Sequence, residues 1–176
     1  MSENIEQEKV VEILNGYFSR ITPIIFKHHG TLDKFMGDGL LAFFGAPISS
    51  EDDPMHAVQT AIEIIREIVS INQQNAKKNW PTLHVSIGIN TGEVVAGYIG
   101  SEDHLNYTVI GDAVNVAQRI ETIADYDTIL ISEAVRSKII DNMDEIQGIR
   151  ALTPLPSQKL KGKEESIQLY RIETAL

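Results

Sequence analysis

The sequence predicts an α+β or α/β fold in which helices cover one face of a mainly antiparallel β-sheet. Helical and strand-like segments alternate along the chain, and two pairs of neighbouring strand-like segments have the spacing of hairpins. The 176 residues, 43% of them hydrophobic and 23% charged, suffice for one domain with a sizeable core. We therefore treat residues 1–176 as one domain.

Composition excludes several classes of function. A formal net charge of -10 argues against a nucleic-acid-binding surface, which needs clustered Lys and Arg. The absence of cysteine excludes disulfides and thiolate metal ligands, and it fits a reducing compartment. The acidic start is not a secretory signal, and no apolar run has membrane-spanning length. We expect a cytoplasmic domain, and an upstream sensor or membrane domain in a longer parent protein is compatible with these features.

The first half of the chain predicts a helix, a hairpin and a second helix. Apolar residues recur every three or four positions between 5 and 28, which predicts a long amphipathic helix that ends near Gly30. Residues 31–45 predict a β-hairpin, because Asp38-Gly39 between apolar runs suits a tight type I′ turn. Asp52-Asp-Pro then predicts the start of the second helix.

The second half predicts strands and shorter helices in alternation. Segments 83–90 and 92–100 have the pattern of two partner strands, the second punctuated by glycine. The segments that follow are a short strand at 107–110, a helix at 111–124, a strand at 128–132, a helix at 133–141 and strands near 145–155 and 166–173.

Three features are candidates for chemistry, each with a structural alternative. Asp38 is either a metal ligand or the residue that a tight turn prefers. Asn115 and Arg119, spaced i and i+4 on one helix face, suit a phosphate beside a hydroxyl, although an Arg on such a helix is more often solvated. The lysines of 159–163 are either an anion site or a solvated charge run. Phosphate-loop, dinucleotide, zinc and Gly-x-Ser-x-Gly motifs are absent.

Four segments, taken in order and with their spacing, closely resemble the catalytic domain of class III nucleotidyl cyclases. They are GTLDKFMGDG (30–39), GINTGEVVAGYIG (88–100), NYTVIGDAVNVAQR (106–119) and LKGK (160–163). The resemblance implies an α+β, ferredoxin-like and polymerase-palm-like core that forms a head-to-tail homodimer with active sites at the interface. It also implies conversion of a nucleoside triphosphate to a 3′,5′-cyclic nucleotide and pyrophosphate with two divalent cations, Mg²⁺ or Mn²⁺.

The resemblance assigns roles to six residues. They are Asp38 (metal), Lys34 and Thr108 (base), Asn115 (ribose), Arg119 (transition state) and Lys161 (terminal phosphates). Lys34 can donate to adenine N1 and Thr108 can accept from the adenine amino group, whereas guanine needs the reverse pattern. The substrate implied is therefore ATP, and the activity implied is that of an adenylate cyclase.

One departure from the family pattern affects the expected activity. The family's first metal-binding aspartate lies on an opening strand, and nothing like that strand precedes residues 2–6. We expect a domain truncated at its first β-strand and weakly active or inactive, because one carboxylate holds two Mg²⁺ ions poorly. The alternatives are a catalytically silent nucleotide-binding or regulatory domain and a guanylate cyclase.

Overall fold

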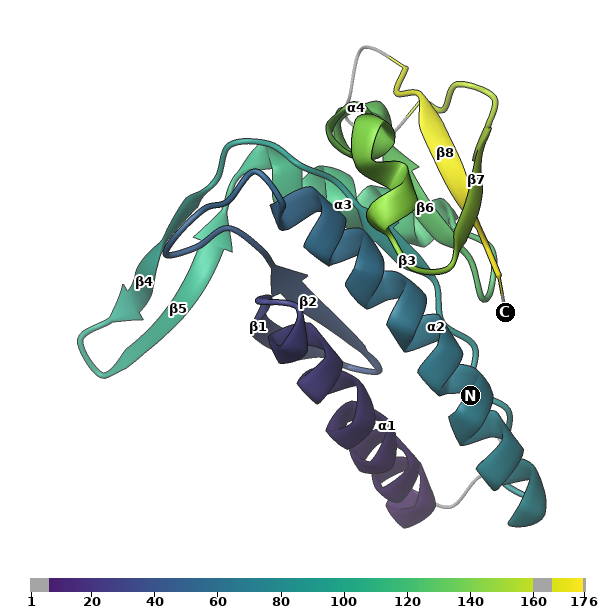
Figure 1. Ribbon diagram of the computed structural model, residues 1–176. Coiled ribbons are helices and arrows are strands. Elements are labelled where there is room, and N and C mark those ends of the chain that lie inside the picture. Colours follow the sequence, from purple (N-terminus) through teal and green to yellow (C-terminus); the bar gives the residue numbers. More distant parts are fainter. Residues whose placement is uncertain (1–6, 160–165, 176) are drawn as a thin grey trace.

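A four-stranded sheet with the order β3–β6–β8–β7 organises the computed structural model, which describes residues 7–159 and 166–175. β3 and β6 are parallel, and β8 is antiparallel to both β6 and β7. The pairs β1–β2 and β4–β5 are separate antiparallel hairpins (Figure 1). The elements are α1 (Gln7–Lys27), β1 (Thr31–Met36), β2 (Gly39–Phe43), α2 (Asp53–Lys77), β3 (Ile87–Ile89), β4 (Val95–Ser101), β5 (His104–Ile110), α3 (Asp112–Ile123), β6 (Ile129–Ser132), α4 (Glu133–Ile139), the 3₁₀ helix η1 (Ile140–Glu145), β7 (Ile149–Pro154) and β8 (Leu169–Thr174).

These elements confirm the predicted α+β class and its mainly antiparallel pairing. β3 forms one edge of the four-stranded sheet. The expectation that an opening strand is missing stays a prediction, because the described residues begin at Gln7.

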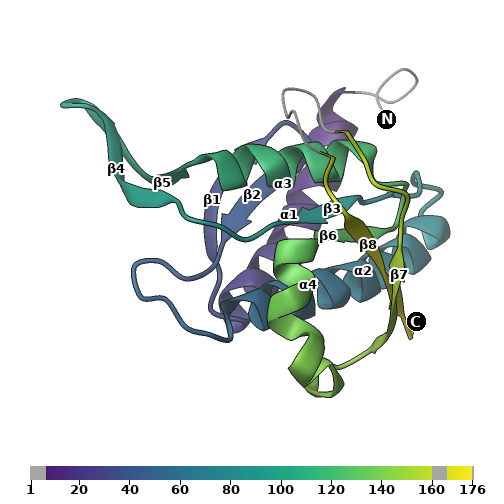
Figure 2. The ribbon, with the colours of Figure 1, turned by 90° about the horizontal axis from the view of Figure 1, so that it is seen from above.

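Helices cover both faces of the sheet, so the prediction that they cover one face was wrong. Ile129 and Ile131 of β6 lie in a core cluster with α2 and α4, whereas Leu130 lies in a second cluster with Val116 and Ile120 of α3. Successive strand residues point to opposite faces, so a strand buried at every position needs cover on both sides. Figure 2 shows α3 on one side of the sheet and α2 with α4 on the other.

The long helices α1 and α2 lie side by side and carry the β1–β2 hairpin (Figure 1). Ile21 and Ile25 of α1 share a buried cluster with Ile68 of α2. Arg20 pairs with Glu67, and its guanidinium also donates to Ser70 Oγ at 2.9 Å and to Gln74 Oε1 at 3.0 Å. These contacts fix α1 against α2, and the ring of Phe18 meets the ring of Phe35 on β1 at a centroid distance of 4.3 Å.

The pairing expected for the middle of the chain was wrong. Segment 92–100 pairs with the strand that follows it, and β3 pairs instead with β6. The β4–β5 hairpin closes between Ser101 and His104 across a two-residue turn, Glu102-Asp103, which lacks the Asn-Gly or Asp-Gly signal of a type I′ turn. The hairpin projects away from the rest of the structure (Figures 1 and 2).

The turn of the β1–β2 hairpin is tight but differs from the predicted type. Met36 pairs with Gly39, which leaves Gly37 and Asp38 as the two turn residues. Gly37 has a φ of 65°, and Asp38 is not among the residues with positive φ. A positive φ at the first turn position alone is the pattern of type II′. Glycine therefore satisfies the backbone requirement, and Asp38 is not needed for it.

Candidate nucleotide site

Lys34 and Thr108, far apart in sequence, meet where β1 contacts β5. Lys34 Nζ donates to Thr108 Oγ1 at 3.2 Å. Thr108 is buried at 7% exposure, whereas the side chain of Lys34 is 49% exposed. The pair thus presents ammonium donors to solvent beside a hydroxyl that the fold holds in place. The structure brings together the two residues that the sequence assigned to the base.

Asp33 is a third member of this cluster, and sequence reasoning missed it. Its side chain is 1% exposed; Thr108 Oγ1 donates to Asp33 Oδ2 at 2.8 Å, and Lys34 Nζ lies 3.6 Å from Asp33 Oδ1. Leu32 pairs with Ala42 and Lys34 with Leu41, so Asp33 is the extra residue of a β-bulge. A regular strand would point Asp33 and Lys34 to opposite faces, and the bulge allows both to reach Thr108.

Asp38 lies at the exposed tip of the β1–β2 hairpin, four residues after Lys34. The negative charge of Asp38 acts on Tyr17 of α1. Burial raises the pKa of Tyr17 to about 12, and the negative charge of Asp38 adds to the rise. Among residues 7–159 and 166–175, no three His, Cys, Asp or Glu side chains are grouped closely enough to hold an ion. Among the described residues, Asp38 is therefore not part of a cluster of three or more metal-binding side chains.

Asn115 and Arg119 lie on α3, which begins directly after β5 and Gly111. Val116 and Ile120 are the buried residues of α3, Asn115 is exposed and Arg119 is half-buried. The hydrogen bonds and ion pairs of the described residues do not connect Asn115 or Arg119 to the Lys34–Thr108 pair within one chain.

Lys161, the residue expected at the terminal phosphates, lies outside the described residues. Its role therefore stays a prediction.

A family model described as the adenylate and guanylate cyclase catalytic domain matches residues 1–173. The chain belongs to this cyclase family. Its cyclase domain is 31% identical to adenylate cyclase 1 of Rhizobium meliloti over 98% of this chain and 25% of that protein. The chain thus spans a quarter of the length of that relative.

Solved cyclases share the fold of this cyclase domain but differ in their named substrates. The adenylyl cyclase CyaB from P. aeruginosa aligns with a TM-score of 0.91 and 30% identity over 99% of this chain and 87% of that chain. The guanylyl cyclase Cya2 aligns with a TM-score of 0.86 and 36% identity over 97% and 83%. Because the guanylyl cyclase has the higher identity of the two, overall identity does not decide the base, and the residues at the site must.

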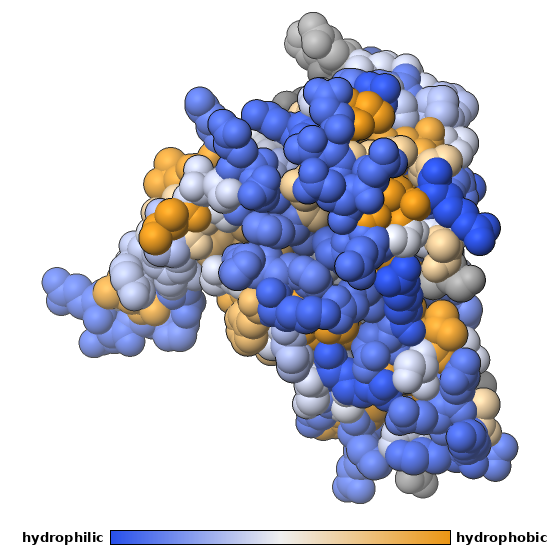
Figure 3. Space-filling model, viewed as in Figure 1, coloured by the Kyte–Doolittle hydropathy of each residue, from blue (hydrophilic) through white to orange (hydrophobic). Residues whose placement is uncertain are grey.

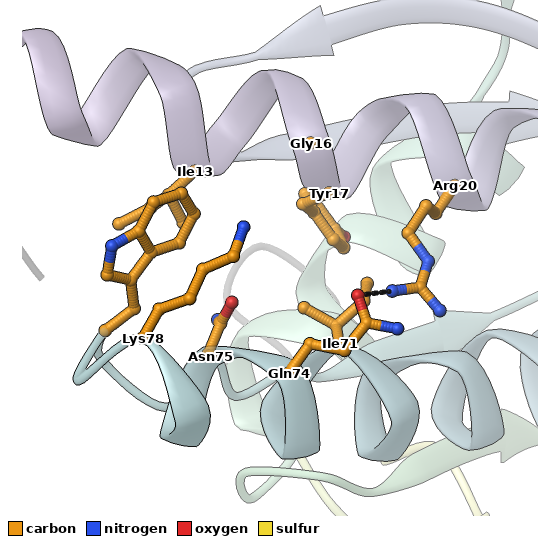
Figure 4. Close-up of a pocket in the computed structure, with 9 residues that line it drawn as sticks. Ile13, Gly16, Tyr17, Arg20, Ile71, Gln74, Asn75 and Lys78 are labelled. Atoms are coloured by element: carbon orange, nitrogen blue, oxygen red, sulfur yellow. Dashed lines mark hydrogen bonds between the residues drawn. The ribbon is translucent and has the colours of Figure 1, made fainter.

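A hollow between α1 and α2 is a separate feature of the cyclase domain (Figure 4). It has a volume of about 100 Å³, and Figure 4 shows Tyr17 and Arg20 of α1 facing Gln74 and Asn75 of α2 across it. Pockets that enclose small-molecule ligands hold roughly 300–1,000 Å³. The hollow is thus too small for a nucleoside triphosphate, and the base-binding candidates are on β1 and β5 instead.

No helix in the described parts of the cyclase domain combines the length and the apolar character needed to cross a membrane.

Proposed function

We propose that this domain is the catalytic domain of an adenylate cyclase, which converts ATP to 3′,5′-cyclic AMP and pyrophosphate. The observation that carries the proposal is the contact between Lys34 and Thr108 beside Asp33. Lys34 has ammonium protons free to donate to adenine N1, and Thr108 has an oxygen lone pair to accept from the adenine amino group. Guanine presents a proton at N1 and an acceptor at O6, so the same pair is mismatched to GTP.

The proposed reaction joins the ribose 3′-oxygen to the α-phosphorus and breaks the bond from that phosphorus to the bridging oxygen of the β-phosphate. The 3′-hydroxyl loses its proton, and pyrophosphate leaves with the electrons of the broken bond. Asn115 would orient the ribose, and the forked donors of Arg119 would stabilise the charge that develops on the α-phosphate oxygens. Lys161 would bind the terminal phosphates.

Two divalent cations, Mg²⁺ or Mn²⁺, are part of the proposal, with Asp38 as one of their ligands. Such ions neutralise phosphate charge and activate the attacking hydroxyl. Asp38 would be one ligand of these ions, whereas the other residues named above would bind and orient the nucleotide.

We place the active sites at the interface of a homodimer. The β4–β5 hairpin projects from the structure and exposes Val95, Tyr98 and Ile110, whose exposed fractions are 70%, 75% and 56%. Figure 3 shows hydrophobic atoms on this hairpin, next to a mainly hydrophilic surface over α1 and α2. A partner subunit would cover these side chains. In a two-fold dimer each subunit can give Asp38 to one site and Arg119 to the other.

Two alternatives have specific support. The identity of 36% to the guanylyl cyclase Cya2 favours GTP as substrate, against the donor pattern of Lys34 and Thr108. The expectation that Asp38 is the single metal-binding carboxylate favours a nucleotide-binding domain without turnover. We expect the domain to work in the cytoplasm, as the cysteine-free composition suggests.

The test is production of cyclic nucleotide from ATP and from GTP with Mn²⁺, by this chain and by a version extended upstream. We expect cyclic AMP and little cyclic GMP, and we expect them from the extended version, because this chain should be weakly active or inactive. Arg119→Lys removes the forked donors but keeps the charge, so kcat should fall by about 10² while the KM for ATP changes little. Arg150→Lys, an exposed change on β7, is the matched control. A preference for GTP would favour a guanylate cyclase, and nucleotide binding without product in either chain would favour the silent domain.

A further inference from the structure

Asp33 is a buried carboxylate with few polar partners. Its side chain is 1% exposed, and its Oδ1 atom is buried without a hydrogen-bond partner. Its polar neighbours are the Thr108 hydroxyl at 2.8 Å and the Lys34 ammonium at 3.6 Å. Burying a carboxylate with so few partners costs stability. A β-bulge is also needed to place Asp33 there, and bulges commonly re-aim side chains near active sites.

The direction of the hydrogen bonds in this cluster is fixed by chemistry. A threonine hydroxyl has one proton and two lone pairs, an ammonium only donates and a carboxylate only accepts. Lys34 therefore uses one lone pair of Thr108 Oγ1, and the proton of Thr108 goes to Asp33. One lone pair remains. As long as Thr108 donates its hydrogen bond to Asp33, it can only accept a further one.

We propose that Asp33 is a positioning residue that sets base specificity, by accepting the hydrogen bond that Thr108 donates so that this hydroxyl can accept from the 6-amino group of adenine but cannot donate to a 6-oxo group. The inference rests on the proposed function and deepens it. Lys34 and Thr108 touch the base, and Asp33 acts through Thr108. Without Asp33, the hydroxyl could rotate and donate, and a 6-oxopurine would become acceptable.

Inosine triphosphate is the probe that isolates this effect. Its base carries the 6-oxo group of guanine but lacks the 2-amino group, so it tests hydrogen-bond direction without the added bulk. We compare the Kd values of ATP and inosine triphosphate, from displacement of a fluorescent ATP analogue, and the cyclic products formed from the two nucleotides.

The main variant is Asp33→Asn, whose amide can donate to Thr108 as well as accept from it. We expect the preference for ATP over inosine triphosphate to fall about tenfold, the effect of one mismatched hydrogen bond. Some preference should remain, because Lys34 still meets N1. Asp141→Asn makes the same chemical change at an exposed position of η1 and should leave the preference unchanged. The ratio of two Kd values from one preparation does not depend on the fraction of folded protein.

A double-mutant cycle tests whether Asp33 acts through Thr108. Thr108→Val removes the hydroxyl, so adding Asp33→Asn to it should not change the preference further. Thr108→Ser keeps the hydroxyl and should keep the full effect of Asp33→Asn. Asp33→Ser, whose hydroxyl can also donate or accept, is a second variant that should lower the preference as Asp33→Asn does.

The outcomes separate this inference from the proposed function. If the unmodified chain binds ATP in preference to inosine triphosphate and Asp33→Asn and Asp33→Ser keep that preference, the role of Asp33 is wrong and the adenylate cyclase proposal stands. An equal fall in the Thr108→Val background also overturns the role of Asp33. Failure of the unmodified chain to bind either nucleotide overturns both proposals.

Discussion

Gly88 on β3 offers the most direct test of how the fold positions the residues of α3. A Cβ atom at this position would lie 2.3 Å from the backbone nitrogen of Glu121 and 2.6 Å from the carbonyl oxygen of Ala117, both on α3. These are backbone atoms, so no side chain can move aside to make room. The helix rests directly on the strand because glycine has no side chain there.

Gly88→Ala should therefore displace α3. Moving the nearest atom from 2.3 Å to an ordinary contact of 3.4 Å requires a shift of about 1 Å. Overpacking of this kind costs roughly 1–3 kcal/mol. In a domain of this size, a cost of about 2 kcal/mol lowers Tm by about 4–8 °C. A 1 Å misplacement of a reacting group can also cost about 10² in rate. If Asn115 and Arg119 act as proposed, kcat should fall even at a temperature where the variant is fully folded.

The assays are urea unfolding and cyclic AMP production at a temperature where both proteins are folded. Gly16→Ala is the matched control, because a Cβ at Gly16 in α1 meets nothing within 4 Å. Alanine there should stabilise the protein by about 0.5–1 kcal/mol. A Gly88→Ala variant as stable as the unmodified chain would refute the close packing of α3 on β3. A destabilised variant with unchanged kcat would refute the dependence of catalysis on the position of α3.

Three further predictions concern the base, alkaline pH and a helix cap. Changing Lys34→Glu together with Thr108→Cys should shift the kcat/KM preference from ATP toward GTP, and an unchanged preference would contradict the base assignment. Tyr17 has a raised pKa of about 12 in the folded state. Its contribution to the free energy of unfolding is therefore complete below pH 10 and is lost as the pH rises to 12, a loss of at most about 2.7 kcal/mol. Urea unfolding of Tyr17→Phe should lack this part of the loss. Ser132→Ala removes the acceptor for Val135 N–H at the start of α4 and should cost about 1 kcal/mol in urea unfolding. The mid-helix control Ser137→Ala should cost nothing.

The long helices were predictable from the sequence because their apolar spacing depends only on local periodicity. α1 and α2 match the predicted segments, and Pro54 lies in the first turn of α2 as expected. The partner of β4 was not predictable in the same way. Pairing is a choice between segments with similar patterns, and the Glu102-Asp103 turn that decides it has no strong turn signature.

The cover on both faces of the sheet could have been recognised from β6. Ile129-Leu-Ile is a continuous apolar run, and such runs are typical of strands buried on both sides. The run predicts a strand, and its lack of alternation also predicts cover on both faces. β3 and β6 pair in parallel, and the long connection between them, which contains the β4–β5 hairpin and α3, provides the crossover that parallel strands need.

The chemistry of the site shows most clearly what the sequence leaves hidden. Lys34 and Thr108 could be assigned to base binding because they lie in family motifs. In the structure, Lys34 Nζ lies 3.2 Å from Thr108 Oγ1. The resemblance assigns no such role to Asp33, and regular strand alternation would turn it away from Lys34. A single extra residue in the pairing with β2 reverses that conclusion. Because Asp33 then accepts the only hydrogen bond that Thr108 can donate, the proposed choice between a 6-amino and a 6-oxo purine depends on a backbone irregularity that residue types alone do not reveal.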